Sequence, residues 1–176
     1  MWLKSIDSTW QLRASPSRVD AHWIRSVDGD ERTDVVEHCI EVLGYLMQQL
    51  NLGIGRIALI FNRFCEADEP TNALIQRFTN NGAQAGPFHN SSNFEIHNHK
   101  LYVLRGLDIP VNSWVRCRIG IVQPSQVQAV TVEQDINTLG EEIDSRVFSV
   151  DEFAQFVREA EGEMENILGL YFPEGE

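Results

Sequence analysis

Hydrophobic residues along this chain recur with two different periods, and the changes of period mark the elements. Apolar positions three and four residues apart predict long amphipathic helices at about 33–50 and about 149–168. A narrower stripe of the same kind, with Pro70 near its start, predicts a short helix at about 69–78. Each helix has one apolar face, so each is expected to pack against another layer.

The last helix has the clearest boundaries in the sequence. Ser149 and Glu152 have the spacing of a capping box, in which each side chain bonds the other's backbone N–H. Gly169 stands where a glycine often ends a helix in the left-handed conformation. These residues predict a helix that begins and ends sharply.

Alternating apolar and polar positions predict strands in most of the remaining chain. Two short runs on either side of "SPS" predict a β-hairpin, and "GRIALIFNRF" predicts a strand buried on both faces. Further strands are predicted by "FEI" and "KLYVL", by "SWVRCRIGIVQ" and by "VQAVTVEQDIN". Neighbouring strands pair antiparallel by preference, so the fold is expected to be α+β, with a mostly antiparallel sheet against the helices. The length of the chain suits a single domain over 1–176.

Acidic residues are concentrated in the C-terminal quarter of the chain. The formal net charge is −12, and the residues from Glu133 onward hold 13 acidic side chains against Arg146 and Arg158. This excess repels nucleic acid, which is not expected as a partner, and attracts a basic protein surface. A solvated acidic helix that keeps the protein soluble has the same composition.

Three histidines, His89, His97 and His99, are the candidate metal ligands. On a continuous strand His97 and His99 point to one face, a spacing that can bind zinc, iron or nickel. The pattern resembles the HxH of cupin metal sites but lacks the glutamate and the later histidine of that pattern. The favoured interpretation makes "HNHK" the tip of a hairpin, because Asn98 suits a turn and polar residues interrupt the apolar run.

Trp114, Arg116 and Arg118 are the candidate protein-interaction residues. They alternate with Val115 and Cys117, so they are expected on the outer face of a half-buried strand. Trp and Arg are enriched at the energetic centres of protein interfaces. The same residues can also lie beneath a neighbouring loop, so the pattern alone leaves both interpretations open.

Other chemistry has little support in the sequence. The chain has no P-loop, nucleophile-elbow or HExxH motif, so no catalytic residue and no cofactor is assigned. Its three cysteines are widely spaced among apolar neighbours, which favours buried thiols over disulfides or a zinc site. No apolar run approaches the ~18 residues of a membrane span, and no secretion signal is evident, so a cytoplasmic protein with no membrane partner is expected.

The order of features resembles a sporadically distributed, uncharacterised family of bacterial α+β proteins. "VDAHWIRSVDGDE", "GIGRIALIFNRF" and the long segment from "VTVEQDIN" to "ILGLYF" are similar to its strand pair, its first central strand and its C-terminal strand and helix. The region 64–104 is not matched. The resemblance implies an α+β order and no activity.

Three functions therefore remain open on the sequence. The first is a non-enzymatic protein-interaction or regulatory module that self-associates, as a homodimer, or holds a protein partner. The second is a metal-binding protein or metal-dependent enzyme using His89, His97 and His99. The third is an acidic nucleic-acid mimic, which requires the acidic residues to form one continuous surface.

Overall fold

The computed structural model describes residues 2–6, 8–24, 34–79, 86–123 and 125–172. The chain divides into two compact units, Met1–Gly53 and Ile54–Glu176. Each unit combines antiparallel strands with helix, so the α+β prediction is confirmed. The prediction of one domain over 1–176 is not tested by this division.

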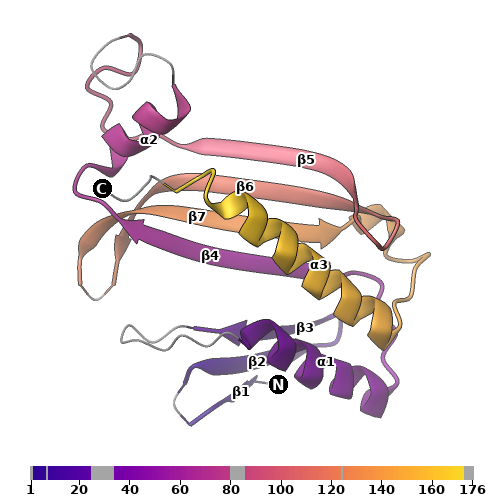
Figure 1. The fold of residues 1–176 in the computed structure, drawn as a ribbon. Helices are drawn as coiled ribbons and strands as arrows, with labels where there is room; N and C mark the ends of the chain where they lie inside the picture. The colour runs from indigo at the N-terminus through magenta and orange to yellow at the C-terminus, as the bar shows by residue number, and fades with distance from the viewer. Residues whose placement is uncertain (1, 7, 25–33, 80–85, 124, 173–176) are drawn as a thin grey trace. The chain divides into compact units, whose positions relative to one another are not determined.

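Unit 1 is a small antiparallel sheet followed by one long helix (Figure 1). The predicted hairpin is confirmed, since β2 and β3 pair continuously across the "SPS" turn. Asn51 ends the helix in the left-handed conformation (φ 47°), which asparagine adopts more readily than most residues. The elements are β1 (Trp2–Lys4), β2 (Trp10–Ser15), β3 (Arg18–Trp23) and α1 (Val35–Leu50).

Unit 2 is built on a four-stranded antiparallel sheet in the order β4-β7-β6-β5 (Figure 1). β6 and β7 are central and pair along almost their whole length, whereas β4 and β5 are its outer strands. The elements are β4 (Ala58–Glu66), α2 (Pro70–Phe78), β5 (Ile96–Leu104), β6 (Ile109–Val122), β7 (Val127–Thr138), the 3-10 turn η1 (Gly140–Glu142) and α3 (Val150–Leu168).

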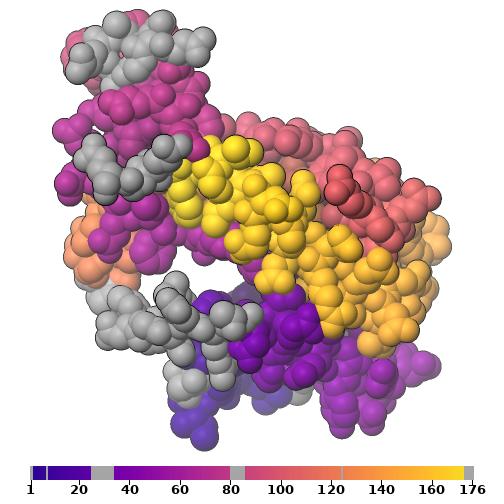
Figure 2. All heavy atoms as spheres, viewed as in Figure 1, coloured from indigo at the N-terminus to yellow at the C-terminus, as the bar shows by residue number. Residues whose placement is uncertain are grey.

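Helix α3 lies along one face of this sheet and, with α2, encloses the core of unit 2. Figure 2 shows α3 in gold and yellow as an unbroken strip on that side of the unit. Phe156, Ala160 and Met164 of α3 are fully buried, as is Leu74 of α2. Leu74 belongs to one apolar cluster with residues of the central strands, namely Val115, Cys117, Val130 and Val132. Both helices therefore lie on the same face, which we call the covered face.

Helix α3 begins and ends where predicted, but the backbone conformation at Gly169 differs from the prediction. The Ser149 hydroxyl accepts from the Glu152 N–H at 3.2 Å while the Glu152 carboxylate accepts from the Ser149 N–H at 2.8 Å. Gly169 has a right-handed conformation (φ −62°), so the left-handed cap predicted there is wrong. The carbonyls of Ile167 and Leu168 instead accept from the N–H groups of Leu170 and Tyr171, and Arg77 of α2 donates to the Gly169 and Leu170 carbonyls just beyond the helix.

The prediction that "HNHK" forms a hairpin tip is also wrong. His97 and His99 lie within β5, which pairs with β6 from Ile96↔Cys117 to Leu104↔Ile109 without interruption. The turn comes later, at 105–108, where Gly106 (φ 83°) and Asp108 (φ 51°) have left-handed backbone. Polar residues inside β5 misled the interpretation: His97 and His99 are exposed on one side of this outer strand, and Asn98, on the other side, donates to the Tyr171 hydroxyl at 2.8 Å.

Candidate functional site

Strand alternation gives the sheet of unit 2 a second face, opposite α3, which we call the open face. The strand registers place one residue from each strand in the same row, so that Ile60, Asp135, Trp114 and His99 lie side by side. In the part of unit 2 that the structure describes, no helix lies on this face. Its principal side chains are Ile60, Asn62 and Phe64 of β4, Thr131, Glu133 and Asp135 of β7, Asn112, Trp114, Arg116 and Arg118 of β6, and His97, His99, Leu101 and Val103 of β5.

Trp114 stands at the centre of the open face in a stack of flat side chains. The His99 ring lies parallel to it, with ring centroids 4.1 Å apart and an interplanar angle of 10°. The Arg116 guanidinium lies 5.7 Å from the Trp114 ring centroid and forms an ion pair with Glu133 on the neighbouring strand. Such contacts fix the orientation of these side chains, so the centre of the face is preorganised.

The predicted interaction residues and two of the predicted metal ligands thus share one face. His99 Nε2 lies 2.6 Å from Asn112 Oδ1, and because that oxygen only accepts, the imidazole must donate from Nε2. His97 Nε2 is 3.4 Å from a Glu95 carboxylate oxygen. His89 lies apart in sequence, in an exposed turn at 86–90. Over the described ranges no group of three or more His, Cys, Asp or Glu side chains is placed to hold a metal.

Apolar side chains flank this centre on both outer strands. Ile60 and Phe64 of β4 are 46% and 53% exposed, and Leu101 and Val103 of β5 are 67% and 54% exposed. Phe64 also lines a shallow hollow of about 190 Å³ together with Arg118 and Thr131. Thr131 also packs against Gly120, where a Cβ would come 2.5 Å from the Thr131 methyl carbon. The open face is therefore apolar at its margins and charged in its middle.

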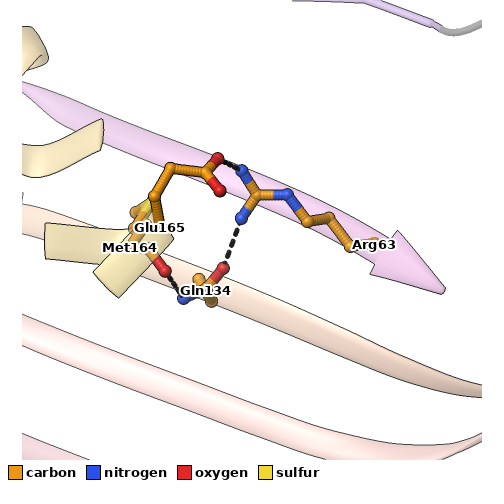
Figure 3. Close-up of polar contacts among 4 residues, drawn as sticks. All are labelled: Arg63, Gln134, Met164 and Glu165. Carbon is orange, nitrogen blue, oxygen red and sulfur yellow. Dashed lines mark hydrogen bonds and ion pairs between the residues drawn. The ribbon is translucent and has the colours of Figure 1, made fainter. Parts of the chain in front are cut away.

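The covered face has a polar contact of a different kind, which joins β4, β7 and α3 (Figure 3). Buried Gln134 accepts from Arg63 at 2.6 Å and donates to the Met164 carbonyl at 2.9 Å. Arg63 also forms an ion pair with Glu165. Burial lowers the pKa of the Arg63 guanidinium, and the charges of Glu165 and Glu161 oppose that shift. Because every group here is partnered within the unit, this contact is structural.

The cysteines do not provide a reactive thiolate at the buried positions. Burial raises the pKa of Cys39 and of Cys117 to about 11, so both thiols are protonated at neutral pH. Cys65 is partly buried and its thiol lies 3.7 Å from the Glu66 carbonyl oxygen. Neither Cys39 nor Cys117 has the environment of a catalytic nucleophile.

The acidic residues that the structure describes do not form one continuous surface. Glu133 and Asp135 lie on the open face, whereas the acidic side chains of α3 lie on the opposite side of the sheet. Glu133 is paired with Arg116, and Glu142 with Arg146 at 3.0 Å. This division gives the nucleic-acid-mimic hypothesis no support.

Comparisons with known proteins add no functional assignment. Among the described residues, no helix is both long and apolar enough to cross a membrane. The resemblance to the bacterial α+β family stays an expectation. A scan against protein-family models, a search of curated proteins and a search of solved structures each found no match for this chain.

Proposed function

We propose that this chain is a non-enzymatic protein-interaction module and that the open face is its contact surface. The observation that carries the proposal is the arrangement of that face: a preorganised Trp114–Arg116 centre between outer strands that expose Ile60, Phe64, Leu101 and Val103. A sheet normally buries its apolar face against another layer, and exposed apolar patches with a Trp/Arg centre are typical of protein interfaces.

The charges of the open face favour a protein over a nucleic acid. Arg116 and Arg118 on β6 are matched by Glu133 and Asp135 on β7, so the middle of the face has no net positive charge. Nucleic-acid surfaces need an excess of cations to neutralise phosphates. A protein surface of mixed charge and apolar margins complements this face better.

The metal-dependent alternative has less support from the geometry. His97 and His99 share the open face, but His99 donates its Nε2 proton to Asn112 and stacks on Trp114. These contacts use the imidazole as part of the flat central stack. We place the module in the cytoplasm, because its three cysteines are free thiols, as is usual in a reducing compartment.

Site-specific photo-cross-linking in cells tests the proposal. A photoreactive amino acid is placed at Leu101 or Phe64 on the open face, and at exposed Asn166 on α3 as the matched control. We expect protein adducts after illumination from the two open-face positions and not from Asn166. Chains that give no adduct from either open-face position, or equal adducts from all three, would contradict the proposal.

A further inference from the structure

We infer that the occupant of the open face is a second copy of this chain, packed face to face about a two-fold axis. The axis lies above the open face, parallel to the strands and over the line between β6 and β7. The inference rests on the proposed function and adds the identity and geometry of the partner. Its basis is the distribution of charge on the two central strands.

Opposite charges on the open face are separated by strand. Arg116 and Arg118 project from β6, and Glu133 and Asp135 project from the neighbouring strand β7. A basic column therefore runs beside an acidic column. A surface of this kind is complementary to itself when a rotation exchanges the two columns, which is the requirement for an isologous interface.

The strand register decides which rotation does this. Arg116 and Glu133 are direct register partners, so they lie in the same row across the sheet. A two-fold axis along the strands keeps the rows and exchanges the columns, which places Glu133 of each copy over Arg116 of the other. A two-fold axis across the strands, centred on the same row, places Arg116 over Arg116 and Glu133 over Glu133. Like charges in direct contact are destabilising, so the axis along the strands is favoured.

Arg118 adds a second reason for an acidic counterpart. Its side chain is exposed, and the described part of the chain offers it no ion-pair partner. It stands two residues along β6 from Arg116, on the same side. In the face-to-face pair, Glu133 of the second copy lies diagonal to Arg118, within reach of its long side chain.

The apolar margins fit the same axis. The rotation that exchanges β6 and β7 also exchanges the outer strands, so β4 of one copy lies over β5 of the other. By register, Ile60 then lies over His99 of the second copy, with Leu101 of that copy as a diagonal neighbour, so both of these exposed apolar side chains become less exposed. Aligned packing of two sheets at a separation of about 10 Å is the common geometry for such faces.

Charge reversal at the paired positions tests this geometry. Arg116→Glu leaves Arg118 as the one basic residue of the two columns, and Glu133→Arg leaves Asp135 as the one acidic residue. We expect the unaltered full-length chain to have the mass of two chains by light scattering, and each variant alone the mass of one. An equimolar mixture of the two variants should regain the mass of two chains, since positions 116 and 133 of one variant are both acidic and those of the other are both basic.

Two further variants keep the test decisive. The double variant Arg116→Glu/Glu133→Arg restores both the pair within the chain and the pairs between copies, so it should be folded and dimeric even if a single variant folds poorly. Glu159→Arg, on α3, changes the same charge away from the open face and should leave the dimer intact. A mixture that stays monomeric, a monomeric double variant, or an unaltered chain that is monomeric at every concentration would overturn the inference.

The cross-linking experiment separates this inference from the proposed function. An adduct from Leu101 with the mass of two chains supports both. Adducts only with a different protein keep the interaction module and overturn the second copy as its partner. An unaltered chain that is monomeric and gives no open-face adduct overturns both.

Discussion

The two faces of the sheet in unit 2 are made by the same four strands and have opposite characters. Along β6, Val111, Val115 and Cys117 are almost completely buried on the covered face, whereas Arg116 and Arg118 lie on the open face. The covered face holds unit 2 together through close packing and internally paired polar groups. The open face contributes few buried contacts to the unit, so its composition is free to serve binding.

Replacing one phenylalanine on each face should give the largest difference in stability between the two faces. Phe156→Ala removes a fully buried ring between α3 and the sheet and should lower the free energy of unfolding by about 3–5 kcal/mol. Phe64→Ala removes a ring that is 53% exposed and should change it by no more than about 0.5 kcal/mol in the dilute monomer. Urea unfolding followed by circular dichroism measures both.

The concentration dependence is the control for this pair. If open faces associate, Phe64→Ala should weaken the dimer and so lower stability only at concentrations where the unaltered chain is dimeric. Equal losses for the two variants in dilute solution would show that Phe64 is part of the core, and the distinction between the faces would fail.

Removing the Gln134 amide, which also lies on the covered face, should cause a smaller loss in the free energy of unfolding than Phe156→Ala. Gln134→Ala deletes the bridge from Arg63 to Met164 and leaves the part-buried Arg63 donor and the buried Met164 carbonyl without that partner, at a cost of about 2 kcal/mol. Gln128→Ala, at an exposed position of the same strand, is the matched control and should cost less than about 0.5 kcal/mol. A similar loss for both would mean that the bridge adds nothing to stability.

The periodic parts of this fold could be predicted because they follow local rules. The long helices and the Ser149–Glu152 cap depend on residues three or four positions apart, which sequence displays directly. The outward direction of Arg116 follows in the same way from alternation with its buried neighbours.

The contacts that complete the site depend on residues far apart in sequence. Nothing near His99 indicates that it stacks on Trp114, because the strand register that aligns them arises only on pairing. Arg77 similarly reaches the segment after α3 from another helix, where it donates to the Gly169 and Leu170 carbonyls. The sequence also did not predict that apolar residues of β4 and β5 are exposed on the open face, because alternation alone does not tell which face of an outer strand is covered.

The alkylation rates of single cysteines measure how exposed individual positions on the two faces are. Burial raises the pKa of Cys117 to about 11, so at about pH 8 its thiolate fraction is far below that of an ordinary thiol. A cysteine introduced by Asn62→Cys, at an exposed open-face position, should be alkylated at least about tenfold faster. Peptide-resolved mass spectrometry of the natively alkylated chain measures both rates, and comparable rates would contradict the burial of Cys117.

The smallest expected effect on stability comes from the cap at the start of α3. Ser149→Ala removes the hydroxyl that accepts from the Glu152 N–H and should cost about 1 kcal/mol at about pH 7. The pKa of Glu152 is lowered by the hydrogen bond from the Ser149 backbone N–H, then by the Ser149 hydroxyl, with a further contribution from Arg146. A carboxylate with a lowered pKa stabilises the fold above its unfolded pKa, and this stabilisation is lost as the pH falls through the folded value.

Glu152→Gln isolates that acid dependence, because the amide keeps the length of the side chain without its charge. The loss of stability between about pH 7 and about pH 3 should be smaller in this variant than in the unaltered chain. Asp151→Asn, at the adjacent exposed position, removes a neighbouring charge that takes no part in the capping box and serves as the control. Identical acid limbs for Glu152→Gln and the unaltered chain would mean that the capping box holds α3 through its neutral hydrogen bonds alone, since the carboxylate charge would then contribute nothing to the folded state.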